Sequence, residues 1–101
     1  MNSRQILKTN DVLVRIMEMD KGSATDWHQH TQVADFFVCL SGAVQVEARG
    51  PEAKIRLLPG QHTQVTAGQV HRVVNVDKDS SEYLLVQGVG AYDFIRQEYR
   101  S

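Results

Sequence analysis

The sequence has few of the residues and segments that define several protein classes. It contains one cysteine, Cys39, so no internal disulfide can form, and the fold must depend on packing, with or without a metal. No apolar stretch approaches the roughly 20 residues that a membrane helix needs, and the first ten residues contain no apolar leader segment. We therefore expect a cytoplasmic protein, in a reducing compartment and without membrane association.

An excess of charge of one sign is also missing. The chain carries 11 Lys and Arg residues against 12 Asp and Glu residues, and they are spread along its length. Because no basic cluster is available to contact phosphates, we expect no nucleic-acid binding. The 101 residues fit one domain, residues 1–101, and 42% hydrophobic residues can supply its core.

Short apolar runs between turn residues predict an all-β fold. The expected strands are 12–19, 34–40, 44–48, 53–58, 63–66, 70–76 and 83–89, with Gly or Pro at several of the corners. Residues 1–11 fit an N-terminal arm or an edge strand. The tail, Tyr92–Tyr99, fits either a terminal strand or a short helix. Many short strands at fairly regular spacing indicate a sandwich or a barrel.

Three of the four histidines stand where they could share one role. His28 and His30 are two residues apart, so on a strand both imidazoles would project from the same face, as a metal site requires. Asp35 begins the next apolar run, and a hairpin would return it to the pair. His71 comes from a distant strand, and only a closed fold could bring it into reach. Taken alone, a His-x-His pair also occurs by chance on surface strands.

The spacing of glycines and histidines gives a more specific signal. The first pattern is Gly22, five residues, His28-Gln29-His30, four residues, Asp35, six residues and Gly42. The second is Gly60, five residues, Thr66-Ala67-Gly68, two residues, His71, three residues and Asn75. These segments, 22–42 and 60–75, resemble the two motifs of the cupin family. They depart from it at Asp35, where Glu is usual, and at Thr66, where Pro is usual.

The resemblance implies a cupin-type double-stranded β-helix, a jelly-roll barrel. It also implies one divalent transition metal ion per chain, with His28, His30, Asp35 and His71 as ligands. Iron, manganese, nickel and zinc all suit these ligands, so the identity of the metal is left open. Asp35 is shorter than Glu, so it ligates directly, ligates through water, or only orients a water. If it is not a ligand, Asp35 is the candidate catalytic base.

The function that the resemblance implies is broad. It predicts a metal-dependent enzyme of dioxygenase, isomerase or lyase type that acts on a small oxygenated or carboxylated organic molecule. The alternatives are a non-catalytic small-molecule binding or sensor module, and a structural barrel whose metal site is vestigial. The family also implies a homodimer formed by exchange of N-terminal strands. Ile6 and Leu7 would then lie on the exchanged edge, unless this terminus is frayed.

Alternation along the strands predicts which neighbours share the site. If Asp35 points inward, Phe37 lines the cavity and Cys39 lies deeper, as a reactive thiol or as a small buried hydrophobe. Val73 and Asn75 point in the same direction as His71. On the late strand, one face carries Tyr83, Leu85 and Gln87 and the other carries Leu84 and Val86, and the sequence does not tell which face lines the cavity.

Three further residues near the motifs have weaker assignments. His62 is expected on the outer face of its strand, because Val65 should face the core. Gln32 would contact substrate or the metal shell if the strand of His30 continued, and otherwise it is an exposed turn residue. Trp27 points away from His28, and we expect it to pack against the N-terminal segment or at a subunit contact.

Overall fold

Eight strands make up the part of the chain that the structure, a computed structural model, describes. This part is residues 2–88, so the predicted element at Tyr92–Tyr99 lies outside the described residues. The strands are β1 (Asn2–Lys8), β2 (Val12–Met19), β3 (Asp35–Ser41), β4 (Val44–Ala48), β5 (Ala53–Leu57), β6 (His62–Val65), β7 (His71–Asn75) and β8 (Ser81–Gly88). The all-β prediction is confirmed, and each of the seven strand ranges predicted from the apolar runs corresponds to an observed strand. Residues 2–88 contain no helix that is long and apolar enough to span a membrane.

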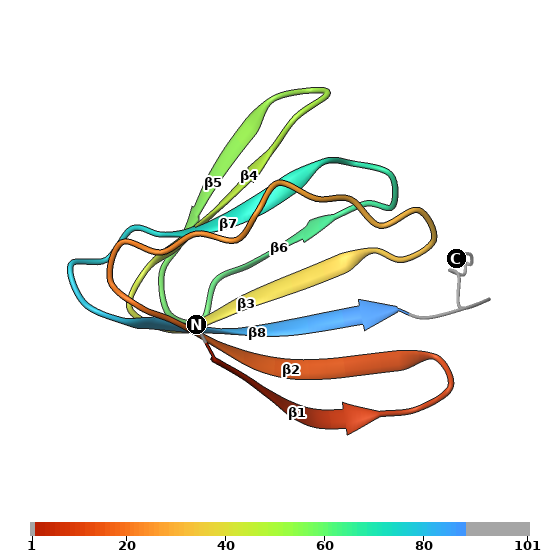
Figure 1. The fold of residues 1–101 in the computed structure, drawn as a ribbon, viewed down its shortest axis with the longest axis horizontal. Coiled ribbons are helices and arrows are strands. Elements are labelled where there is room, and N and C mark those ends of the chain that lie inside the picture. The colour runs from red at the N-terminus through yellow and green to blue at the C-terminus, as the bar shows by residue number, and fades with distance from the viewer. Residues whose placement is uncertain (1, 89–101) are drawn as a thin grey trace.

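The strands form two antiparallel sheets, with the core between them (Figure 1). One sheet has five strands in the order β1-β2-β8-β3-β6, and the other has three in the order β5-β4-β7. From β3 onward the chain changes sheet repeatedly, between β3 and β4, β5 and β6, β6 and β7, and β7 and β8. This arrangement confirms the predicted jelly-roll barrel.

The core follows the alternation of the strands. On β3, Phe37 and Cys39 point inward and are 2% and 0% exposed, as predicted. On β8, the face with Tyr83 and Leu85 is the buried one, which answers the question that the sequence left open. Burial raises the pKa of the Cys39 thiol, so this residue is a small buried hydrophobe rather than a reactive thiol.

Gly42 lies at a junction between the two sheets. Its φ is 76°, a left-handed conformation that favours glycine, and Gly60 and Gly68 have φ of 88° and 83°, as expected for residues at strand reversals. Beside Gly42, the Ser81 hydroxyl accepts a hydrogen bond from the backbone amide of Ala43 at 3.0 Å and donates one to Asn75 Oδ1 at 2.8 Å. The ends of the two motif segments are therefore tied together at the start of β8.

The N-terminus forms an edge strand, which was one of its two predicted states. β1 pairs with β2 of the same chain, and it leaves Ile6 and Leu7 about half exposed, at 52% and 51%. Exchange of this strand between two chains stays a prediction.

Candidate metal centre

His28 and His30 lie on an extended segment rather than on a strand, so the predicted strand is wrong. An isolated bridge at His28 holds this segment to β7, because the backbone amides of His28 and His71 each donate to the carbonyl of the other residue, at 3.0 and 2.8 Å. The predicted hairpin to Asp35 is also not formed, because residues 31–34 carry the chain from the β7 side of the barrel to β3 in the other sheet. The two imidazoles still face one region, with ring centroids 5.1 Å apart.

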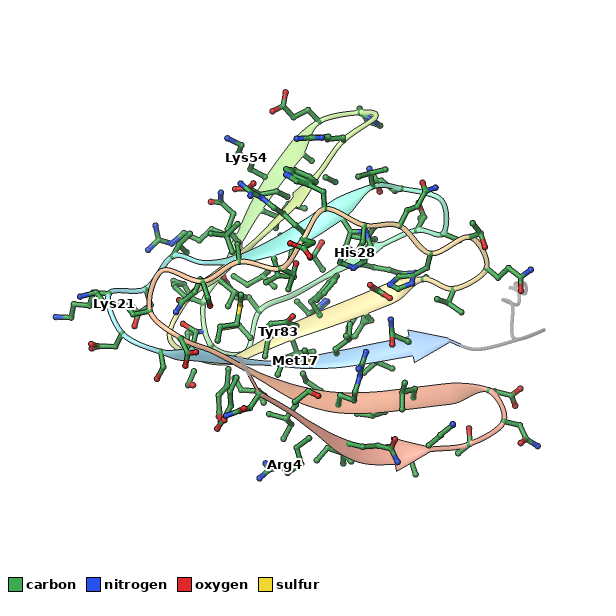
Figure 2. The ribbon with its side chains drawn as sticks, in the orientation of Figure 1. Arg4, Met17, Lys21, His28, Lys54 and Tyr83 are labelled. Atoms are coloured by element: carbon green, nitrogen blue, oxygen red, sulfur yellow. The ribbon has the colours of Figure 1, made fainter. Side chains whose placement is uncertain are left out.

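Four potential ligands from three segments meet between the sheets. His71 begins β7 and Asp35 begins β3, and both are 2% exposed, while His28 and His30 are half-buried. One ligand atom from each of His28, His30, Asp35 and His71 lies within 4.8 Å of the other three, so the cluster could hold a metal ion. In Figure 2 the labelled His28 lies between β7 and β3 and Tyr83 lies on β8, whereas Lys21 and Lys54 extend from the periphery.

Backbone carbonyls set the orientation of two imidazoles. The Nδ1–H of His28 donates to the carbonyl of Asp26 at 2.7 Å, and the Nδ1–H of His71 donates to the carbonyl of Gln69 at 2.8 Å. Because a carbonyl can only accept, Nδ1 carries the hydrogen in both rings. This leaves Nε2 of each ring available to a metal, which is the usual support for a metal-binding histidine.

A hydrogen bond links His71 and Asp35, the two most buried members of the cluster. His71 Nε2 lies 2.9 Å from Asp35 Oδ2, and His30 Nε2 lies 3.3 Å from the same oxygen. Burial by itself lowers the pKa of His71, but the hydrogen bond to Asp35, the Gln69 carbonyl and the carboxylate charge outweigh it and raise that pKa. Burial likewise raises the pKa of Asp35, but hydrogen bonds from His71 and Gln87 and the charges of His30 and His71 hold that pKa below its usual value.

Gln87 and Arg15 extend the cluster, and sequence reasoning assigned neither of them a role. Gln87 is the cross-strand neighbour of Asp35, and its Nε2 donates to Asp35 Oδ1 at 2.9 Å and approaches His30 Nε2 at 3.4 Å. The Nη2 of Arg15 donates to Gln87 Oε1 at 3.1 Å, which fixes the orientation of the amide. The signal available in the sequence was strand alternation, which places Gln87 on the same face of its strand as Tyr83 and Leu85, and Arg15 on the same face as Met17 and Met19.

A cavity of about 140 Å³ adjoins the cluster. Its polar lining includes Arg15, Thr25, His28, His30, Asp35, Tyr83 and Gln87, and its apolar lining is Met17, Phe37, Val73 and Leu85. Burial, followed by the charge of Asp35, raises the pKa of Tyr83 to about 12, so its hydroxyl stays protonated. The prediction that Phe37 lines the cavity is confirmed.

The remaining predicted residues lie outside the cavity. His62 is exposed and stands beside Phe36, with ring centroids 5.3 Å apart, as expected for the outer face. Gln32 is an exposed residue in a bend and does not line the cavity. Trp27 is half-buried, and the guanidinium carbons of Arg49 and Arg72 lie over its ring at 3.8 and 4.8 Å from the centroid, so the structure gives it packing partners that the sequence did not indicate.

The cluster fits a transition metal ion by donor type and by size. Two ligands at about 2.1 Å from one ion are at most about 4.2 Å apart, so a spread of 4.8 Å needs only a small contraction. Nitrogen donors with one carboxylate suit zinc, iron, nickel and manganese. The half-buried faces of His28 and His30 leave an approach from solvent.

Comparison with known families agrees with the fold and the cluster. The family model for the cupin domain matches residues 15–87, which includes all four potential ligands. This chain belongs to the cupin family. No curated protein matches its sequence closely enough to be named as a relative.

Solved cupin-like structures superpose on most of the chain. KdgF from Halomonas sp. has 22% identity and a TM-score of 0.76, with 89% of this chain and 79% of that chain covered. TT1209 from Thermus thermophilus has 24% identity and a TM-score of 0.78, with coverages of 88% and 83%. A protein with a double-stranded beta-helix domain from Klebsiella pneumoniae has 23% identity and a TM-score of 0.73, with coverages of 88% and 76%. At these identities the likeness establishes the fold alone.

Proposed function

We propose that this cupin is a metal-dependent enzyme, of dioxygenase, isomerase or lyase type, acting on a small oxygenated or carboxylated organic molecule. The proposal rests on one observation, the convergence of three imidazoles and one carboxylate within 4.8 Å beside a cavity that reaches solvent. His28, His30, Asp35 and His71 would hold one divalent transition metal ion. When bound, the ion would supply Lewis acidity toward a substrate oxygen or a binding place for dioxygen.

The side chains around the cluster have separate tasks in this proposal. Gln69 and Asp26 hold two imidazoles in one tautomer through their carbonyls. The hydroxyl of Tyr83, protonated at neutral pH, can donate a hydrogen bond into the cavity but does not act as a base. Phe37 and the other apolar side chains of the lining keep water from the inner end of the cavity and strengthen polar contacts there.

Asp35 serves as a ligand in this proposal. Its pKa lies below the usual value, so the carboxylate is ionised at neutral pH and is a weak base. Its Oδ2 lies 3.3 Å from His30 Nε2 and 2.9 Å from His71 Nε2, so one ion among these three atoms could be bound by all of them. The role of catalytic base therefore stays the alternative.

Turnover separates the enzyme from a non-catalytic binding or sensor module. Protein loaded in turn with iron(II), manganese, nickel or zinc is incubated with a panel of enediols, phenols and keto acids. Oxygen consumption and product formation are followed, with the Asp35→Asn variant as control. Turnover in the wild type that the variant loses supports the enzyme. Tight binding of panel members without turnover under any metal would support the binding module instead.

We also propose a cytoplasmic homodimer in which two chains exchange their N-terminal strands, β1. The support is an edge strand with two half-exposed apolar residues, Ile6 and Leu7, because unpaired strand edges favour association. Light scattering coupled to gel filtration tests the proposal, which predicts twice the 11.4 kDa chain mass. A monomer at micromolar concentration would contradict it.

A further inference from the structure

Arg15 is a charged side chain of the cavity. Its contact with Gln87 uses only part of its hydrogen-bond donors. Arg15 lies on the inner face of β2, the same face as the apolar Met17 and Met19, and it is half-buried. A guanidinium carries five N–H donors, and within residues 2–88 the one hydrogen-bond acceptor that they reach is Gln87 Oε1. Its Nε is buried and has no hydrogen-bond partner among the described residues.

Such a group is costly in a barrel interior. A buried donor without a partner lowers stability, and most buried polar groups in proteins are satisfied. An apolar side chain of similar length would complete the inner face of β2 without this cost. The exception therefore needs an explanation, and its position at the cavity suggests a ligand as the missing partner.

The charges around the cavity indicate what kind of ligand this is. Among the described residues that line it, Arg15 is the one permanent cation and Asp35 the one carboxylate. A divalent ion on the cluster would more than offset Asp35, so both sides of the cavity would then be positive. The lining between them contains the apolar Phe37 and Leu85. A small anion with a short carbon frame complements this pattern.

We infer that Arg15 binds the carboxylate of the substrate, and that the substrate class is a small organic acid whose second oxygen function faces the metal cluster. This inference rests on the proposed function and narrows it. Gln87 holds one side of the guanidinium, as its hydrogen bond at 3.1 Å shows, and so orients the remaining donors. A planar guanidinium recognises a carboxylate through two parallel hydrogen bonds, which a point charge does not reproduce.

The test compares carboxylates with uncharged molecules of the same shape. Glycolate, pyruvate and malonate are titrated by calorimetry into zinc-loaded protein, and glycolamide, pyruvamide and malonamide serve as their neutral partners. Wild-type protein should bind at least one acid about tenfold or more tightly than its amide, because hydrogen bonds between charged groups are strong. If no acid binds better than its amide, the inference is wrong.

Two variants then identify the residue that binds the carboxylate. Arg15→Met should lose about tenfold or more of the affinity for the acid and leave the affinity for the amide unchanged, while Arg15→Lys should retain part of the preference. Arg56→Met, at an exposed position on β5, is the matched control and should bind as the wild type does. Circular dichroism confirms that each variant is folded.

Metal content is measured in the same samples, so that the two proposals fail separately. If Arg15→Met holds metal fully and binds the acid as the wild type does, the inference is overturned and the metal site stands. If Arg15→Met binds the acid normally once excess zinc restores a reduced metal content, Arg15 only positions Gln87 and the inference is again overturned. If the wild type holds no metal but prefers the acid through Arg15, the inference stands and the proposed function fails.

Discussion

Replacement of Gly42 by alanine should be far more damaging than the same replacement at Gly60. Both residues have left-handed φ, 76° and 88°, a conformation that costs an alanine roughly 1–2 kcal/mol. Part of this cost is offset because alanine lowers the conformational entropy of the unfolded chain. A methyl group at Gly60 would meet nothing within 4 Å, whereas one at Gly42 would collide with the Ser81 hydroxyl and approach its Cβ to 2.9 Å. Overpacking of this kind adds about 1–3 kcal/mol.

The expected losses are about 1 kcal/mol for Gly60→Ala and about 2–4 kcal/mol for Gly42→Ala. For a domain of this size they correspond to decreases in Tm of roughly 4–8 °C and 8–32 °C. Urea unfolding followed by circular dichroism measures both, with equal m values as the check that only stability has changed. Equal losses in the two variants would mean that the packing of Ser81 against Gly42 carries no free energy, and the prediction would be wrong.

Three further predictions concern the cluster. Gln87→Leu should weaken zinc binding about tenfold or more in competition with a chelating dye, because it removes the hydrogen bond that orients Asp35. The control Gln64→Leu, at an exposed position on β6, should bind zinc as the wild type does. Equal zinc affinities of Gln87→Leu and the wild type would contradict the orienting role of Gln87. Metal-free protein should have its highest Tm between about pH 4 and 6.5. The pKa of His71 is raised in the folded protein, so its contribution to stability is full below pH 6.5 and is lost as the pH rises through the folded pKa. The pKa of Asp35 is lowered, so its contribution to stability is present above pH 3.8 and is lost as the pH falls through the folded pKa. A Tm at pH 8.5 equal to that at pH 5.5 would contradict this prediction. Metal-loaded protein should release its ion below about pH 6, because the imidazole ligands become protonated.

The sequence predicted the fold well because strand alternation and turn residues are local signals. The inward positions of Phe37 and Cys39 follow from a period of two, and the left-handed glycines follow from the positions where strands reverse. The segment of His28 and His30 was harder to predict. Its partner is β7, and isolated bridges to a distant strand leave no periodic signal in the segment itself.

The potential ligands were predictable from the family motifs, but their surroundings were not. Gln87 and Arg15 meet the cluster through pairing of β8 with β3 and of β2 with β8, and this register depends on contacts far apart in the sequence. The contacts of Trp27 with Arg49 and Arg72 also join residues far apart in the sequence. Strand alternation could restrict these residues to a face, but only the register of the sheets shows which side chains they touch.

Metal stoichiometry is the decisive measurement for the proposed metal centre. Wild type, His71→Ala and His62→Ala are loaded with zinc, dialysed at pH 7.5 and measured by elemental analysis, with circular dichroism to confirm folding. We predict one ion per chain in the wild type and in His62→Ala, whose side chain lies outside the cluster, and little or none in His71→Ala. Full metal content in folded His71→Ala, or none in the wild type, would contradict the proposed ligand set.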